Sequence, residues 1–178
     1  MLPDYPNILL VSGSGRNVGK TTFSTSLIAA FAHQKPVAVK VSPHWHPVSS
    51  DDPLLYIPDN LLLIKEQNRT GTKDTSRMLR SGASEVYYVQ TIRDDYLMQA
   101  FHRIMQPGME TKPIIVESAA LGDYIRPAVH FHIDRPGHDV DPSKNRNIQP
   151  DYRINFNGQS FDFDIKRIQW NDHRWVIH

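Results

Sequence analysis

The stretch GSGRNVGKTT at residues 13–22 follows the apolar run NILLVS at residues 7–12. A short, continuous apolar run that ends in glycine is typical of a strand buried on both faces of a parallel sheet. From Gly19 onward, apolar side chains recur at the spacing of one helix face: Phe23, Leu27, Ile28 and Phe31. The sequence therefore predicts a strand, a glycine-rich turn and a helix.

The composition of this turn is that of a loop that binds phosphate groups. Glycines let backbone N–H groups wrap closely around phosphate oxygens, and the following helix presents free N–H groups and the positive end of its dipole. Lys20 is expected to contact the β and γ phosphates of a nucleoside triphosphate, and the Thr21 hydroxyl to bind Mg²⁺. The predicted nucleotide contacts are Gly13, Ser14, Gly15, Arg16, Asn17, Val18, Gly19, Lys20, Thr21 and Thr22.

The spacing of the loop differs from the usual Gly, four residues, Gly-Lys-Ser/Thr. Ser14 stands where the first glycine is expected, and Gly13 lies six residues before Gly19. The loop is therefore a variant that is one residue longer. A glycine-rich turn that binds nothing is the alternative, but the flanking strand and helix favour phosphate binding.

Strand and helix patterns alternate along the rest of the chain. We predict strands at residues 37–41, 61–66, 85–90, 113–118 and 128–133, and helices at residues 74–81 and 94–105. This alternation implies an α/β fold with a mostly parallel sheet, and the loop narrows the expectation to the three-layer fold of P-loop nucleoside triphosphatases. Residues 42–60 hold four prolines and are predicted to be an extended functional loop. Residues 61–66 could be an edge strand.

The pattern changes after residues 134–151, which have the composition of a loop. Two hairpins are predicted there: residues 154–163 around Asn157-Gly158, and residues 168–177 around Asn171-Asp172. We expect a single nucleotide-binding domain over residues 1–178, with residues 151–178 as a small β appendage.

Composition excludes several classes of function. A formal net charge of +1 gives no basic field for nucleic acid or an anionic membrane. The absence of cysteine excludes disulfides, thiolate catalysis and cysteine-ligated metals. The first residues lack the pattern of a signal peptide, and no apolar stretch is long enough to span a membrane. We expect a cytoplasmic protein that binds neither nucleic acid nor membranes.

Carboxylates beside the loop are candidates for holding Mg²⁺. Glu117 ends an apolar strand, where open α/β sheets bind ligands, although a solvated strand-end acid is the alternative. Asp74 stands at a helix start and could cap that helix instead. Asp52 is a weaker candidate, because Asp-Asp before proline suits a turn. Lys40, near the end of the second strand, is expected to reach the nucleotide or a substrate anion unless it is an ordinary exposed lysine.

Two histidine pairs share one spacing. His44 and His46 would share a face of an extended segment, and His130 and His132 repeat the pattern. Two such pairs could build a metal site. We favour a simpler interpretation, because no third ligand can be assigned: the first pair lines a polar substrate loop and the second pair is structural.

Three segments resemble the MobB-type proteins of molybdopterin-guanine dinucleotide biosynthesis. Residues 73–83 (KDTSRMLRSGA) are similar to their K-D-S…AGA segment, and residues 114–118 (IIVES) to their h-h-V-E-G strand end. Residues 39–44 (VKVSPH) resemble their second-strand lysine and histidine-bearing loop. The resemblance covers about residues 7–122. It implies a Mg²⁺-dependent, GTP-binding homodimer that works with a cofactor-biosynthesis protein and hydrolyses GTP slowly.

The layout is also similar to dethiobiotin synthetase, of the wider MinD/CobQ/ParA-like group. By that resemblance, Mg²⁺ is held by Thr21, Asp74 and Glu117, and Lys20 and Lys40 are the catalytic cations. The displaced loop glycine is closer to this family than to the MobB type.

Ser118 replaces the glycine after Glu117, which departs from the MobB-type pattern. No Asn/Thr-Lys-x-Asp guanine signature is present, and Lys144-Asn145 is only a weak candidate for the base site, so the base is undecided between GTP and ATP. The leading hypothesis is a MobB-type GTP-binding adaptor for molybdenum cofactor assembly. A dethiobiotin-synthetase-like ligase or kinase, with ATP and a small carboxylate substrate, is the second. A nucleotide-binding module without turnover is the third.

Overall fold

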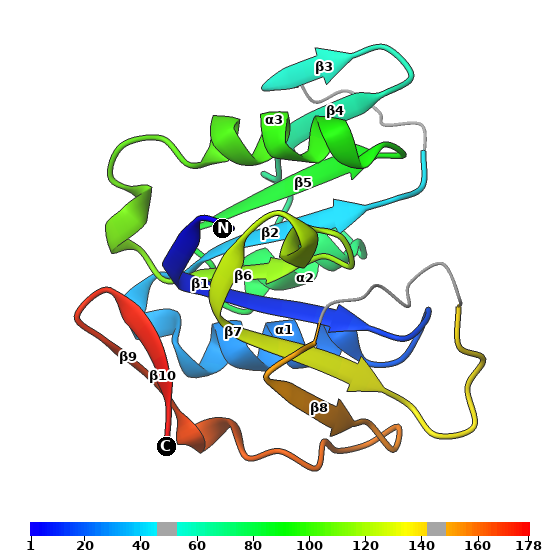
Figure 1. Cartoon of the computed structure of the whole chain (residues 1–178), viewed down its shortest axis with the longest axis vertical. Helices are drawn as coiled ribbons and strands as arrows, with labels where there is room; N and C mark the ends of the chain where they lie inside the picture. Colours follow the sequence, from blue (N-terminus) through cyan, green and yellow to red (C-terminus); the bar gives the residue numbers. More distant parts are fainter. Residues whose placement is uncertain (46–52, 142–148) are drawn as a thin grey trace.

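The computed structural model describes residues 1–45, 53–141 and 149–178. In these residues a mixed sheet of eight strands has the order β3-β4-β5-β2-β6-β1-β7-β8 (Figure 1). The strands of the sheet are β1 (Asp4–Gly13), β2 (Val37–Ser42), β3 (Leu55–Ile57), β4 (Leu61–Lys65), β5 (Glu85–Thr91), β6 (Ile114–Glu117), β7 (Arg126–Asp134) and β8 (Tyr152–Asn155). A separate hairpin and the α-helices are β9 (Ile168–Asn171), β10 (Arg174–Ile177), α1 (Lys20–Ala30), α2 (Asp74–Arg80) and α3 (Asp94–Ile104).

The strands from β5 to β8 in the sheet order all run parallel. β1 lies between β6 and β7, with Leu10 paired to Val116 on one side and to His130 on the other. Because parallel strands end at the same edge, the residues that close β1, β2, β6 and β7 meet there. The predicted α/β fold with a mostly parallel sheet is confirmed.

The apolar run of β1 is buried from both sides. Leu9 and Val11 belong to the core on the face that α1 and α2 cover. Ile8 and Leu10 belong to the core on the opposite face, which α3 covers. All four are fully buried, and each contributes about 1.5–3 kcal/mol of transfer free energy. A strand covered on both faces needs apolar residues at every position, which is why the run does not alternate.

No helix in the described ranges is long and apolar enough to cross a membrane.

The prediction of one extended loop over residues 42–60 is wrong in its second half. β3 forms there and pairs antiparallel with β4, with Leu55 opposite Leu63. β4 is consequently not an edge strand, because it lies between β3 and β5. Residues 61–64 of β4 are all buried, which explains their continuous apolar character.

The predicted hairpin at residues 154–163 is also largely wrong. β8 instead joins the main sheet, parallel to β7, with Ile154 opposite Ile133. Only an isolated bridge between Phe156 and Phe161 retains antiparallel pairing. The Asn157 side-chain oxygen accepts hydrogen bonds from the N–H groups of Gln159 and Ser160, which closes a local turn. Burial of Ile154 in the core decides against the free-standing hairpin, so the appendage starts after β8.

The second predicted hairpin is confirmed as β9 and β10, with its turn moved by one residue. Asn171 pairs with Arg174, and both intervening residues, Asp172 and His173, have positive φ. Two left-handed residues are the geometry of a type I′ turn. The Trp175 indole N–H donates to the Asn7 carbonyl oxygen at 2.9 Å and fastens the hairpin to β1.

Candidate functional site

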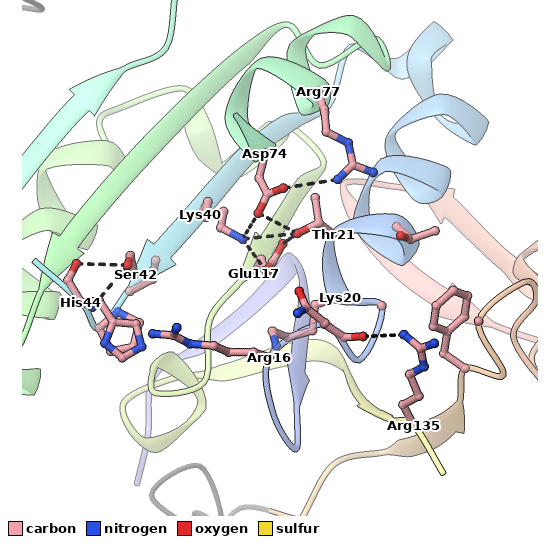
Figure 2. A pocket seen from close by; sticks show the side chains of 17 residues that line it. Arg16, Lys20, Thr21, Lys40, Ser42, His44, Asp74, Arg77, Glu117 and Arg135 are labelled. Atoms are coloured by element: carbon pink, nitrogen blue, oxygen red, sulfur yellow. Dashed lines mark hydrogen bonds and ion pairs between the residues drawn. The ribbon is translucent and has the colours of Figure 1, made fainter. Parts of the chain in front are cut away.

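A cavity of about 530 Å³ opens at the carboxyl edge of the parallel strands (Figure 2). The size suits a small-molecule ligand. The ends of β2 and β6, the segments that follow β1, β2, β7 and β8, and the first turns of α1 and α2 line it. The polar and charged lining residues are Arg16, Asn17, Lys20, Thr21, Thr22, Lys40, Ser42, His44, Asp74, Arg77, Glu117 and Arg135.

Steric limits explain the glycines of the loop between β1 and α1. Gly19 has φ 103° and forms the N-terminal boundary of α1. A Cβ there would lie 2.7 Å from Cδ1 of Phe156, so both the conformation and the space require glycine. At Gly13, a Cβ would lie 2.8 Å from the Ile133 carbonyl oxygen. The displaced glycine thus lets the loop pass close to β7.

Ser14, at the expected first glycine position, is held by backbone hydrogen bonds. Its N–H donates to the Ile133 carbonyl oxygen at 3.1 Å, and its own carbonyl oxygen accepts from the Asp141 N–H at 2.9 Å. The residue is buried. The longer loop is therefore anchored to β7 and to the segment after it. Lys20 folds back over this loop, where its Nζ donates to the Gly15 carbonyl oxygen.

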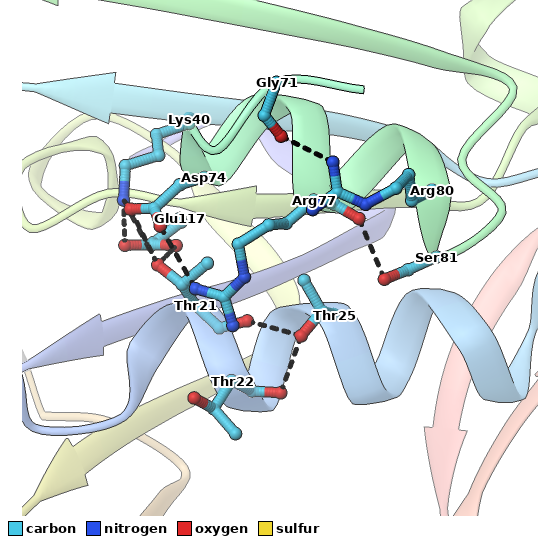
Figure 3. Close-up of polar contacts among 10 residues, drawn as sticks. All are labelled: Thr21, Thr22, Thr25, Lys40, Gly71, Asp74, Arg77, Arg80, Ser81 and Glu117. Atoms are coloured by element: carbon cyan, nitrogen blue, oxygen red, sulfur yellow. Dashed lines mark hydrogen bonds and ion pairs between the residues drawn. The ribbon is translucent and has the colours of Figure 1, made fainter. Parts of the chain in front are cut away.

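Four side chains from four elements converge on one point beside the loop (Figure 3). The Lys40 Nζ lies 2.7 Å from Asp74 Oδ2 and 2.7 Å from Glu117 Oε1. The Thr21 hydroxyl lies 3.1 Å from Asp74 Oδ2 and 3.0 Å from Glu117 Oε2, and 3.3 Å from the Lys40 Nζ. We call Thr21, Lys40, Asp74 and Glu117 the acid cluster.

Charge pairing favours the ionised forms of Lys40 and Asp74. Burial on its own would lower the pKa of Lys40, but the charges of Glu117 and Asp74 and the hydrogen bonds to them outweigh it, so the pKa is raised. Burial would raise the pKa of Asp74, but the Lys40 charge, with hydrogen bonds from Lys40 and Thr21 and the charge of Arg77, lowers it. Glu117 is the most deeply placed, with its side chain only 5% exposed.

The charges around the cavity favour an anionic ligand. Five cationic side chains line it against two carboxylates, and these cations are Arg16, Lys20, Lys40, Arg77 and Arg135. Arg77 pairs with the outer oxygen of Asp74, Oδ1, at 3.3 Å. Both acids are already paired by Lys40, so the remaining cations supply the excess positive charge.

The donor set of the acid cluster fits magnesium. Mg²⁺ takes oxygen ligands, commonly one or two carboxylates with phosphate oxygens and waters. Thr21, Asp74 and Glu117 offer three side-chain oxygen groups around one point, at the rim of a cavity large enough for phosphates. The described part of the chain holds no group of three or more His, Cys, Asp or Glu side chains that could bind a metal ion.

The loop residues divide into two groups. Arg16, Asn17, Gly19, Lys20, Thr21 and Thr22 line the cavity. Gly13, Ser14, Gly15 and Val18 are buried behind it and shape the loop. Asp74 lies at the first residue of α2, faces the acid cluster and does not cap its helix through its side chain.

The two predicted histidine pairs have different positions in the structure. His44 lines the cavity, whereas His46, Asp52 and Lys144-Asn145 lie outside the described residues. His130 and His132 lie on β7, where the Ser12 hydroxyl is 2.7 Å from His130 Nε2 and 3.0 Å from His132 Nδ1. We call Ser12, His130 and His132 the histidine cluster.

The histidine cluster is neutral at pH 7 and almost fully buried, and His132 Nε2 also lies 3.4 Å from Asp134 Oδ1. Burial, aided by the nearby charges of His132 and Arg153, lowers the pKa of His130 to about 4. Burial also lowers the pKa of His132, against the opposing charge of Asp134. One consistent set of protons has His130 donating to Ser12 and Ser12 donating to His132 Nδ1. None of the three lines the cavity.

Sequence reasoning missed five cavity residues: Val41, Arg77, Arg135, Phe156 and Gly158. Arg77 stands three residues after Asp74, a spacing that places both on one helix side. Arg135 directly follows β7, so the strand-end rule could have found it. Its guanidinium donates to the Asn17 carbonyl oxygen at 3.1 Å and lies 5.6 Å from the Phe156 ring centroid. Phe156 carried no sequence signal, because its position depends on how β8 joins the sheet.

No protein-family model matches the chain, and neither a curated protein nor a solved structure matches it. The geometry of the cavity and the motifs in the sequence are therefore the observations that bear on function.

Proposed function

We propose that this chain binds a nucleoside triphosphate together with Mg²⁺ in the cavity, in the manner of P-loop proteins. The convergence of Thr21, Asp74 and Glu117 beside the Lys20 loop carries this proposal. These residues come from distant parts of the chain, yet the two carboxylate oxygens lie 3.1 Å and 3.0 Å from the Thr21 hydroxyl. Bound Mg²⁺ would neutralise phosphate charge there, while Lys20 and Lys40 would provide cations for the phosphate oxygens.

The MobB-like role remains the leading form of the proposal. The segments that resemble that family supply Lys40, Asp74 and Glu117, and all three meet in the acid cluster. In this role the protein binds GTP, hydrolyses it slowly and acts as a homodimeric adaptor for nucleotide attachment to the molybdenum cofactor. The partner would be another protein of cofactor biosynthesis.

A dethiobiotin-synthetase-like reaction is the second candidate, because the cavity extends past Lys40 to Ser42 and His44. A small carboxylate held there could receive the γ-phosphoryl group of ATP, with catalysis by positioning and charge neutralisation. ADP release that depends on such a substrate would favour this candidate. A module without turnover would show binding but no multiple-turnover hydrolysis.

The test is a titration with non-hydrolysable GTP and ATP analogues, with and without Mg²⁺. Wild-type protein is expected to bind at least one of the two analogues more tightly in the presence of Mg²⁺ than in its absence. Lys20→Ala is expected to bind that analogue about 100-fold more weakly than wild type, because a charged contact is removed. Lys166→Ala, which removes an exposed lysine outside the cavity, is the matched control. Equal affinity of wild type and Lys20→Ala would overturn the proposal.

A further inference from the structure

The Lys40 ammonium lies among the oxygen groups that the proposed function assigns to Mg²⁺. Its Nζ is 2.7 Å from Asp74 Oδ2 and 2.7 Å from Glu117 Oε1, with the Thr21 hydroxyl oxygen at 3.3 Å. Figure 3 shows the lysine pointing at both carboxylates from β2. A cation of the protein itself thus interacts with the proposed metal ligands.

Electrostatics explains why a cation is needed there. Asp74 and Glu117 both approach the same hydroxyl, and Glu117 is buried. Two neighbouring carboxylates repel each other, and a buried carboxylate without a counter-charge is costly. Arg77 does not meet this need, because it contacts the outer oxygen of Asp74. Among the described residues, the ion pair of Glu117 is with Lys40.

The lysine and a metal ion at this point compete for the same two carboxylate groups. Mg²⁺ binds its oxygen ligands at about 2.0–2.1 Å, so an ammonium group cannot keep its contacts to both carboxylates beside it. Two cations at one point also repel. Lys40 therefore has to leave at least one carboxylate before Mg²⁺ can use both.

We propose that Lys40 is a displaceable internal cation that makes metal binding conditional on the triphosphate. Without ligand, Lys40 neutralises Asp74 and Glu117 and keeps free Mg²⁺ out. A triphosphate in the cavity offers the ammonium a new anionic partner, so Mg²⁺ can take over the carboxylates. This inference rests on the proposed function, and it deepens it by giving the metal and the triphosphate a reciprocal dependence.

The first test measures Mn²⁺ binding by electron paramagnetic resonance, without nucleotide. Lys40→Met is expected to bind Mn²⁺ about tenfold more tightly than wild type, because the internal cation is gone. Lys40→Arg, which keeps the charge, should remain close to wild type. A Lys40→Met/Glu117→Gln variant should lose the gain, which places the Mn²⁺ in the acid cluster. Equal Mn²⁺ affinity in wild type and Lys40→Met would overturn the inference, provided circular dichroism shows that both are folded.

The second test uses wild-type protein, so it does not depend on the folding of a variant. Tripolyphosphate should raise the protein's affinity for Mn²⁺, after correction for Mn²⁺ bound by tripolyphosphate in solution. The increase should be smaller in Lys40→Met, where no internal cation has to be displaced. Absence of an increase in wild type, while nucleotide binds, would contradict the inference alone. Failure of both tripolyphosphate and nucleotide to bind would contradict the proposed function, whereas the Mn²⁺ gain of Lys40→Met would still stand as evidence for the displaceable lysine.

Discussion

The acid cluster and the histidine cluster occupy neighbouring positions at the carboxyl ends of parallel strands, yet they differ in charge and access. The acid cluster combines one ammonium with two carboxylates and lines the cavity. In the histidine cluster, two imidazole rings lie within hydrogen-bonding distance of the Ser12 hydroxyl. This cluster is almost fully buried and lies outside the cavity lining.

This difference separates a site from a structural network. A charged group that remains accessible can exchange its partner for a ligand, whereas a buried neutral network keeps the partners that the fold gives it. We therefore expect changes in the acid cluster to alter ligand binding, and changes in the histidine cluster to alter the free energy of unfolding.

The largest expected effect is acid destabilisation through His130. The pKa of His130 is about 4 in the folded protein against an ordinary value of 6.5, so the unfolded chain binds the proton more tightly. The contribution of neutral His130 is complete above pH 6.5 and is lost as the pH falls toward 4, by about 3 kcal/mol in all. Urea unfolding measured between pH 7 and pH 4 checks this loss.

His130→Gln should flatten that pH dependence, because the replacement does not titrate. His102→Gln is the matched control, since His102 is exposed on α3. If His130→Gln and wild type lost stability in parallel over this range, His130 would not be the source of the acid sensitivity.

The next largest effect is expected for Thr21→Val, which keeps the side-chain shape but removes the hydroxyl shared with Asp74 and Glu117. The Mg²⁺-dependent part of the nucleotide affinity should fall by about 100-fold, or about 2.7 kcal/mol, while the affinity without Mg²⁺ changes little. Calorimetric titrations with and without Mg²⁺ separate the two terms. Thr25→Val is the control, because Thr25 hydrogen-bonds within α1. Equal losses with and without the metal would argue against Thr21 as a metal ligand.

Ser12→Ala should give the smallest of the three effects. It removes the hydroxyl between His130 and His132 and leaves buried ring nitrogens without that partner, at a cost of about 1–2 kcal/mol in the free energy of unfolding. Nucleotide affinity should stay within about twofold of wild type, since the hydroxyl lies outside the cavity lining. A large loss of affinity with unchanged stability would break the distinction between the two clusters.

Much of the fold could be predicted from local sequence patterns. The run at residues 7–12 has to be covered on both faces, and the periodicity after Gly19 gives α1. Asp74 and Glu117 could be proposed as site residues because they stand at a helix start and a strand end. Their alternative roles could not be excluded locally, since a helix cap and a metal ligand look alike in sequence.

The C-terminal part shows where local patterns failed. Asn157-Gly158 indicated a hairpin, but β8 pairs with β7 because that pairing buries Ile154 in the core. The free energy that a turn sequence contributes to a hairpin is small compared with the free energy gained by burying a core side chain. Phe156 reaches Gly19 only as a result of this pairing.

The sequence by itself determined a buried strand, a glycine-rich loop and a helix, because hydrophobic periodicity and glycine placement are local properties. Tertiary structure alone decided that Lys40, Asp74 and Glu117 meet at Thr21, since the order β2-β6-β1 aligns distant strand ends at one edge. It also decided that Lys40 pairs with both carboxylates. Pairing of this kind depends on distances between side chains that are far apart in the chain, and such distances are fixed only when the sheet has formed.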